Sequence, residues 1–193
     1  MEESTREGLL VDGTGVPLAE EDSGSVELLD GTSLAYRAIS RENFAALQRF
    51  HHRLGQRSIY LRFFGAEPKL SGRKAGYFTN VDRINRFALV ALEPERPEEI
   101  IAVVSFDTEG RKDRAEYAAA VEERWQGRGL SLALTRCLIE AAIERGIRVL
   151  TGTLLFENAR MLNLLRDLGL PEKLRCEDGI EYVEKGPLPQ RSG

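Results

Sequence analysis

The chain has 193 residues, a length that accommodates one domain and at most a short appendage. Hydrophobic residues make up 42% of the sequence and charged residues 30%, which is the balance of a globular protein with a sizeable core. The formal net charge of -4 excludes a nucleic-acid-binding protein whose affinity depends on bulk positive charge, so no nucleic acid partner is expected.

Three features that the sequence lacks narrow the class of protein further. The N-terminus is acidic and has no apolar region of the kind found in secretory signal peptides, and no apolar run approaches membrane-spanning length. We therefore expect a cytoplasmic protein without a membrane partner. The two cysteines, Cys137 and Cys176, are far apart, and no Cys/His group has zinc-site spacing, so no metal is predicted.

The composition divides the chain into three segments. Residues 1–24 combine several acidic residues with Gly, Ser and Thr, so we expect them to be disordered or loosely docked. Residues 25–187 carry regular hydrophobic patterns and are predicted to form the folded domain. Residues 188–193 are predicted to be a flexible tail.

The first half of the domain is predicted to contain a hairpin followed by short helices. Asp30-Gly31 separates two apolar runs at 26–29 and 33–39, which is a strong hairpin signal. Apolar spacing and flanking breaker residues then predict a helix from Ser40 to Leu54, a short helix or turn at 56–64, and a short helix near 77–78.

The second half is predicted to alternate strands with two longer helices. The expected elements are strands at 87–92, 99–106 and 114–122, a helix at 128–145, a strand at 148–154, a helix at 158–168, and a hairpin of strands at 173–177 and 181–185. Runs of antiparallel strands around one strand–helix–strand crossover imply an α/β (α+β) fold. Its sheet would be mixed, mostly antiparallel, with helices on both faces.

The most informative stretch is a Gly-containing loop between a predicted strand and helix: Gln126, Gly127, Arg128, Gly129, Leu130 and Ser131. The glycines leave backbone N–H groups uncovered, and the helix start adds unpaired N–H groups and partial positive charge. Phosphate is the natural ligand of such a site, while a plain helix-capping turn is the alternative. A P-loop is excluded because no Lys-Ser/Thr follows the last Gly, and a dinucleotide fingerprint because the loop lies late in the chain.

This loop resembles motif A of the GNAT (Gcn5-related N-acetyltransferase) superfamily, Gln/Arg-x-x-Gly-x-Gly/Ala, which holds the pyrophosphate of acetyl-CoA. Upstream, Ala115-Glu116-Tyr117 is similar to the family's fourth strand. Downstream, Asn158 leads an apolar helix that ends Leu168-Gly169-Leu170, similar to the family's Asn…Leu-Gly-Phe segment. The runs at 36–39 and 57–64 resemble the acetyltransferase domain of bacterial Pat-type protein lysine acetyltransferases.

The resemblance implies a set of residues that would bind acetyl-CoA as cosubstrate. Backbone N–H groups of residues 126–131 would bind the pyrophosphate, and the Arg128 side chain would either add charge there or lie in solvent. The backbone N–H of Val121 would polarise the thioester carbonyl if this strand splays from the next, and would otherwise make an ordinary ladder bond. Asn158 would contact the pantetheine arm, although it also suffices as a helix cap.

A base is useful for transfer to an amine, because the amine is mostly ammonium at neutral pH. Glu116 is the candidate, since alternation along the strand places it on one face with Ala118 and Ala120. Partial burial there would raise the pKa of its carboxyl. Pat-like enzymes carry a catalytic Glu at the matching Ala-Glu position, whereas a solvated Glu at the start of a strand is the alternative.

Two positions depart from the family pattern. Ser131 replaces the final Gly or Ala of motif A, and Leu165 stands where many members carry a Tyr general acid. The sequence predicts an acetyl-CoA-dependent N-acetyltransferase that acts by direct attack of a protein lysine or a small-molecule amine. The alternative is a non-catalytic acyl-CoA-binding regulatory module on the same fold. The acceptor, the acyl-chain preference and the oligomeric state, a dimer included, stay open.

Overall fold

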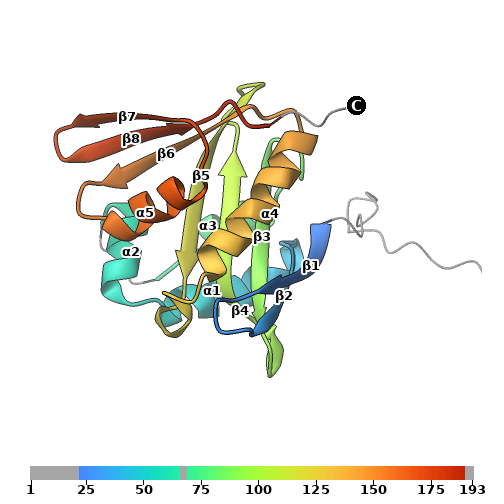
Figure 1. The fold of residues 1–193 in the computed structure, drawn as a ribbon. Helices are drawn as coiled ribbons and strands as arrows, with labels where there is room; N and C mark the ends of the chain where they lie inside the picture. Colours follow the sequence, from blue (N-terminus) through green and yellow to red (C-terminus); the bar gives the residue numbers. More distant parts are fainter. Residues whose placement is uncertain (1–21, 66–68, 190–193) are drawn as a thin grey trace, which may run out of the picture.

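The computed structural model describes residues 22–65 and 69–189, which form an eight-stranded sheet with helices on both of its faces (Figure 1). The strand order is β1-β2-β3-β4-β5-β6-β8-β7, and every pair of neighbours is antiparallel except β5 and β6. The strands are β1 (Ser23–Glu27), β2 (Ser33–Ala38), β3 (Arg86–Glu93), β4 (Arg96–Asp107), β5 (Arg114–Val121), β6 (Val149–Leu155), β7 (Glu172–Glu177) and β8 (Ile180–Lys185). The α/β fold predicted from the sequence is confirmed.

Both predicted hairpins and the predicted crossover are present. The turn at Asp30-Gly31 joins β1 to β2, and the turn at Asp178-Gly179 joins β7 to β8. The crossover is formed by α4 (Leu130–Glu144), which links the parallel strands β5 and β6. A parallel pair requires such a long connection, because a tight turn can join only antiparallel strands.

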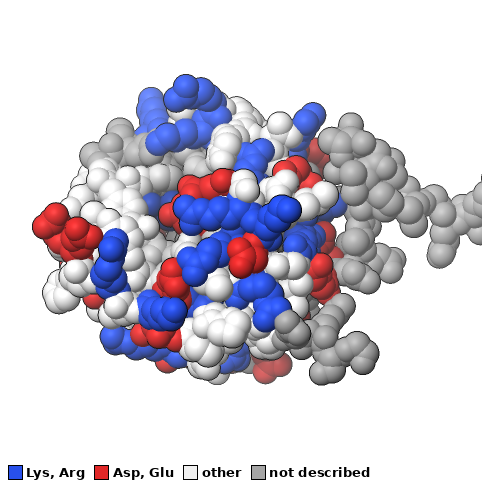
Figure 2. Space-filling view, turned by 90° about the horizontal axis from the view of Figure 1, so that it is seen from above, with Lys and Arg blue, Asp and Glu red and all other residues white. Residues whose placement is uncertain are grey.

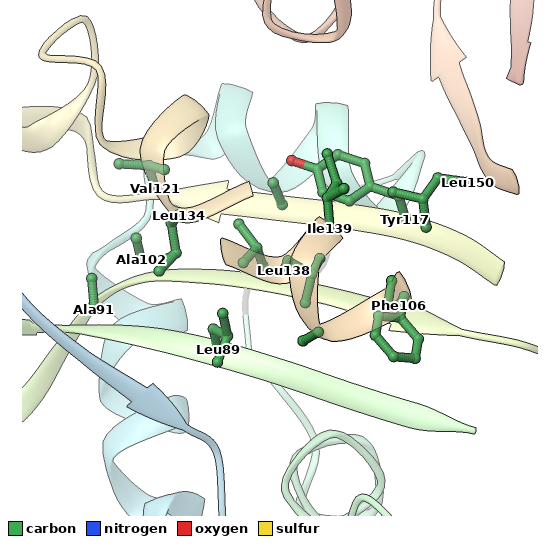
Figure 3. Packing of buried hydrophobic residues seen from close by; sticks show 14 of the residues in the cluster. Leu89, Ala91, Ala102, Phe106, Tyr117, Val121, Leu134, Leu138, Ile139 and Leu150 are labelled. Carbon is green, nitrogen blue, oxygen red and sulfur yellow. The ribbon is translucent and has the colours of Figure 1, made fainter. Parts of the chain in front are cut away.

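The helices are divided between the two faces of the sheet, and each face has its own apolar cluster. On one face lie α4 and α5 (Ala159–Asp167), and Figure 3 shows Leu134 and Leu138 of α4 packed over the central strands. On the other face, buried side chains such as Leu47 and Phe50 pack against β3 and β4. The elements of that face are η2 (Arg41–Asn43), α1 (Phe44–Arg53), α2 (Gln56–Phe63) and α3 (Gly72–Thr79).

Helix α3 begins several residues before the short helix that the sequence predicts near 77–78. The Ser71 side chain accepts a hydrogen bond from the backbone N–H of Lys74 at 3.3 Å, which caps the first turn. Ala75, the fully buried residue of α3, then anchors the helix in the second cluster. Gly72 and Gly76 lower helix propensity, so the first turn of α3 gives only a weak helix signal in the sequence.

The boundaries expected for the folded domain need correction at both ends. At the start, β1 begins at Ser23, and Asp22 is buried and paired with Arg145 at 3.1 Å. At the end, the side chain of Leu188 is only 1% exposed and its N–H donates to the Arg148 carbonyl at 2.7 Å. Residues 22–24 and 188 are therefore parts of the fold, and the remaining terminal residues lie outside the described part of the chain, apart from the exposed Pro189.

Replacing Leu188 by Ala is expected to destabilise the domain even though the sequence suggests a loose tail. Removing a fully buried Leu side chain leaves a cavity that typically costs about 2–5 kcal/mol. A urea titration followed by circular dichroism should show a lower midpoint with an unchanged slope. The matched control is Leu29→Ala, because Leu29 is 84% exposed. Equal midpoints for the two variants would show that Leu188 contributes nothing to the core.

The face seen from above in Figure 2 carries Lys and Arg side chains alternating with Asp and Glu. Ion pairs of this kind join the start of β5 to β8, where Arg114 lies 2.7 Å from Glu184. Exposed pairs like this one contribute little to stability, but the two opposite charges of each pair cancel much of each other's electric field. Among the described residues, no helix is long and apolar enough to cross a membrane, and no group of His, Cys, Asp or Glu is arranged to hold a metal ion.

Candidate active site

The parallel strands β5 and β6 separate part-way along their length. They pair only at their first positions, from Arg114 opposite Val149 to Glu116 opposite Thr151. Beyond that point β6 continues beside β8, and β5 continues beside β4 as far as Val121 (Figure 1). The second half of β5 therefore has a partner strand on one edge only, which is the splay that the resemblance implies.

The unpaired edge of β5 presents backbone N–H groups toward the region between the two strands. The N–H of Glu122, one residue beyond the strand, donates to the Ile101 carbonyl of β4 at 3.0 Å. Because successive residues of a strand direct their N–H groups to opposite edges, those of Val121 and Ala119 face away from β4. The carbonyl of Val121 confirms this direction, since it accepts a hydrogen bond from the Gln126 side chain at 2.8 Å.

The loop predicted to bind pyrophosphate lies at the end of this edge and opens helix α4. After η3 (Glu123–Trp125), Gly127 and Gly129 adopt positive φ angles of 74° and 84°, which glycine tolerates and other residues rarely do. A Cβ at Gly127 would meet nothing within 4 Å, so the backbone there is open to a ligand. Gly129 is the N-cap of α4 and has no side chain to satisfy the first N–H groups of the helix. The loop can therefore offer several N–H donors to an anion.

The side chain of Arg128 is held by the β1–β2 turn, a contact that the sequence did not indicate. Its guanidinium pairs with Asp30 at 2.6 Å, donates to the Thr32 hydroxyl at 3.0 Å, and lies over the ring of Trp125 at 4.4 Å. Hydrogen bonds from Thr32, and then from Arg128, lower the pKa of the Asp30 carboxyl to about 2. The Arg128 carbonyl also accepts from the N–H of Leu29 at 3.0 Å. The turn thus supports the loop from outside.

Glu116 lies where β5 and β6 begin to separate, on the face of the sheet that also carries α2. Its side chain reaches solvent, with the small side chains of Ala118 and Ala120 farther along the same face. The pKa of the Glu116 carboxyl is raised, first by partial burial and then by the negative charge of Glu109. Arg62 of α2 lowers the same pKa and offsets part of that shift. A carboxylate with a raised pKa in this position suits a proton acceptor.

Asn158 and Gln126 are both held by contacts that the structure shows in detail. Asn158 is buried and caps α5, where its side chain accepts from the N–H of Met161 at 3.2 Å. The Gln126 side chain donates to Ser58 of α2 at 3.2 Å and accepts from the Arg160 side chain of α5. Gln126 therefore connects helices on opposite faces of the sheet across the end of β5.

Comparison with known proteins decides the family. The sequence model of the Acetyltransferase (GNAT) family matches residues 57–170, which is more than half of the chain. The chain belongs to the GNAT family. The solved GNAT domain of S. lividans PAT is 31% identical, with a TM-score of 0.80, and the match covers 86% of this chain and 98% of that chain. This match agrees with the Pat-type resemblance found in the sequence.

Other relatives of this GNAT chain match it at lower identity. An acetyltransferase of Pseudomonas aeruginosa is 24% identical over 86% of this chain and 90% of its own length. The spermidine N-acetyltransferase of Vibrio cholerae, solved with CoA and spermine, is 14% identical with a TM-score of 0.63, over 80% of this chain and 95% of that chain. An acetyltransferase of Salmonella typhimurium, described as putative and solved with acetyl-CoA, is 17% identical with a TM-score of 0.62. The match covers 82% of this chain and 96% of that chain.

The GNAT position that often holds a Tyr acid is occupied here by the buried Leu165. A small cavity lies beside it between the separating strands, and Tyr117 and Thr135 also line this cavity. The Tyr117 hydroxyl lies 2.7 Å from the Thr135 hydroxyl, and burial is the main reason that the pKa of Tyr117 is raised to about 12. Burial thus makes the Tyr117 phenol a weaker proton donor than an ordinary tyrosine.

Two side-chain contacts that shape this site carried no signal in the sequence. Asp30 was recognised only as a turn residue, yet it holds Arg128 from 98 positions away. The loop at 126–131 was expected to act through its backbone, yet the Gln126 side chain donates to Ser58 of α2, 68 positions away. Each of these contacts joins elements that are distant along the chain, so only the tertiary structure reveals them.

Proposed function

We propose that this protein is an N-acetyltransferase that moves an acetyl group from acetyl-CoA to a primary amine, with Glu116 as general base. The observation that supports this most is the unpaired edge of β5. This edge runs between the open loop at residues 126–131 and Glu116. The loop offers N–H donors for phosphate, the edge of β5 offers N–H donors for a carbonyl, and Glu116 offers a base. A binding site for a phosphate-containing thioester needs these groups in that order.

The spacing along β5 suggests how the backbone donors would be divided. Val121 is five residues from Glu116, about 17 Å along an extended strand, which is too far for a Glu side chain to reach. Ala119 is three residues away, about 10 Å, a distance that the Glu116 side chain and one water molecule can span. We therefore place the thioester carbonyl near the Ala119 N–H, in place of the Val121 N–H that the resemblance implies. The Val121 N–H would then bind the adjoining pantetheine amide. Asn158, which follows β6 and caps α5, would contact the pantetheine arm.

The proposed reaction is a direct attack of the amine on the thioester carbonyl. Glu116 takes a proton from the ammonium group, directly or through water, and leaves the nitrogen lone pair free to form the new C–N bond. The backbone N–H of β5 stabilises the oxyanion that develops on the carbonyl oxygen. The attacking nitrogen then gives up its second proton to solvent, the C–S bond breaks, and the CoA thiolate departs. Thiolate is a stable leaving group near neutral pH, so the reaction can proceed without the Tyr that Leu165 replaces.

Two classes of acceptor amine fit the proposal, and the protein lysine is favoured. The relative with the higher identity of those described is the GNAT domain of S. lividans PAT, whereas the polyamine enzyme of Vibrio cholerae is only 14% identical. Exposed aromatic side chains on and just after α2, Tyr60 and Phe64, lie on the face that carries Glu116. Aromatic residues of this kind often contribute to protein–protein contacts.

The alternative function is an acyl-CoA-binding module without catalysis. Leu165 is the observation that favours it, because the side chain is buried and cannot act as an acid. Ser131 does not favour it, since a small residue in the first turn of α4 leaves the N–H groups accessible. The raised pKa of Glu116 argues against the alternative, because a binding module has no need of a base.

Titration with acetyl-CoA should change the fluorescence of the protein, because its single tryptophan, Trp125, directly precedes the loop at 126–131. We expect saturable binding, followed by acetylation of lysine-containing peptides or polyamines that mass spectrometry detects. Binding without any acetylated acceptor would select the non-catalytic module. No saturable binding by fluorescence or by calorimetry would contradict both functions.

A further inference from the structure

Helix α2 begins without any cap supplied by its own sequence. Its N-cap is Gly55, which has no side chain, and its first turn contains no acidic residue. The missing acceptor comes from far along the chain, since the Glu123 carboxylate accepts a hydrogen bond from the N–H of Gly55 at 2.8 Å. Glu123 lies in η3, two residues after Val121 and three residues before the loop at 126–131. A carboxylate in this position also interacts favourably with the helix dipole.

The identity of residue 55 is explained by this contact. The φ angle of Gly55 is -66°, a value that any residue adopts, so the backbone conformation does not require glycine. A Cβ at this position would lie 2.6 Å from the Glu123 Oε1 atom, closer than real atoms approach. Glycine is therefore needed for the Glu123 carboxylate to reach the helix.

Two further contacts hold the same two segments together. At the end of α1, the Arg53 guanidinium lies 3.1 Å from the Glu122 carboxylate and 2.6 Å from Glu99, and both carboxylates are buried. In the first turn of α2, Ser58 accepts the hydrogen bond from Gln126 described above. Residues 53–58 and residues 122–126 thus form three successive contacts, with the Glu123 cap in the middle.

The contacts at the start of α2 affect the groups at its other end, near Glu116. This helix packs against β5 on the face that carries Glu116, and Arg62 in its last turn is near enough to influence the Glu116 carboxyl. Movement of the segment 122–126 would therefore be transmitted to the groups around the base. We propose that Glu123 is a positioning residue. It caps α2, the helix beside the site proposed for the acceptor amine, and couples that helix to the loop at 126–131. This inference rests on the proposed function, because it assumes that CoA occupies the loop.

Hydrogen exchange of the full chain, with and without CoA, tests this coupling. In the parent protein, CoA should slow exchange in the loop at 126–131 and also in α2. In Glu123→Ala, exchange in α2 should be about fivefold faster without ligand, as for a lost helix cap, and CoA should then slow the loop alone. Glu123→Gln keeps an acceptor oxygen and should restore most of the protection. The matched control is Glu177→Ala, which removes an exposed carboxylate from β7 and should behave as the parent.

Gly55→Ala examines the same contact from the helix side. It should displace the Glu123 carboxylate and lose CoA-dependent protection of α2, although Ala favours a helix more than Gly does. Equal CoA-dependent protection of α2 in the parent and in Glu123→Ala would overturn the inference. Slowing of the loop without slowing of α2 in the parent would overturn it too, while leaving the proposed function intact. No slowing of the loop at all would instead remove the proposed function, and the inference with it.

Discussion

Glu116→Gln is expected to lower kcat/KM for the amine acceptor about 10²-fold or more near neutral pH. The substitution keeps the size of the side chain and removes its basicity, so binding of acetyl-CoA should be unchanged. The deficit should shrink as pH rises, because free amine then becomes available without help from a base. A steady-state pH profile on the acceptor found by mass spectrometry measures both effects. Transfer at the parental rate by Glu116→Gln would exclude Glu116 as the base.

The raised pKa of Glu116 also predicts where the activity of the parent protein declines on the acid side of its pH profile. The base must be ionised, so activity should fall as pH drops through the Glu116 pKa, which lies above the ordinary value for Glu. The matched control is Glu109→Gln. Removing the nearby charge of Glu109 should lower the Glu116 pKa and move the acid limb to lower pH while keeping the base. An acid limb that does not move would show that Glu109 has no influence on the group that titrates.

Stability should respond in the opposite sense to activity. A carboxyl whose pKa is raised on folding binds more protons in the native state than in the unfolded state, between the two pKa values. Its ionisation therefore opposes folding, and this effect is present above the native pKa and absent below the unfolded one. Glu116→Gln should unfold at the same or a slightly higher temperature than the parent at neutral pH. Such a pair of results would identify a group retained for function at the expense of stability.

The order of the secondary-structure elements could be read from the sequence because each depends on local signals. Asp30-Gly31 and Asp178-Gly179 each predict a hairpin, and the structure contains both. The apolar spacing after Gly129 predicts α4 to within a few residues. The prediction of a flexible tail from residue 188 was wrong at Leu188. Neighbouring Gly and Pro residues indicate a loose segment, but the Leu188 side chain is buried in the core.

The surroundings of the site could not be read in the same way. A strand pattern at 114–121 shows that β5 exists, but it does not show that β6 pairs with it at three positions only. The contact of Glu123 with Gly55 and that of Arg128 with Asp30 join residues far apart in sequence. Such contacts depend on how the elements pack, and periodicity along one segment carries no information about them. The resemblance to GNAT proteins predicted the separation of β5 from β6, and the structure revealed the side-chain partners around the site.

Gly129→Asp is expected to weaken binding of CoA about 100-fold or more while the protein stays folded. Two unit charges 4 Å apart near a protein surface repel each other by about 4 kcal/mol, and the new carboxylate would lie beside the pyrophosphate. The substitution also adds a Cβ 3.0 Å from the Leu29 side chain, in a residue whose φ of 84° disfavours a side chain. Leu29 is largely exposed and can move, so the fold should survive.

Gly129→Asn separates the two causes, because Asn matches Asp in size, carries no charge, and tolerates positive φ better than most residues. Calorimetric titration with CoA should give the weakest binding for Asp, intermediate binding for Asn and the tightest for the parent. Added salt should narrow the gap between Asp and Asn, since the repulsion between exposed charges is screened. Equal loss in both variants would mean that shape alone matters at Gly129. Unchanged affinity in Gly129→Asp would place the pyrophosphate away from the start of α4, and would leave the unpaired edge of β5 without the anchor that the proposed function requires.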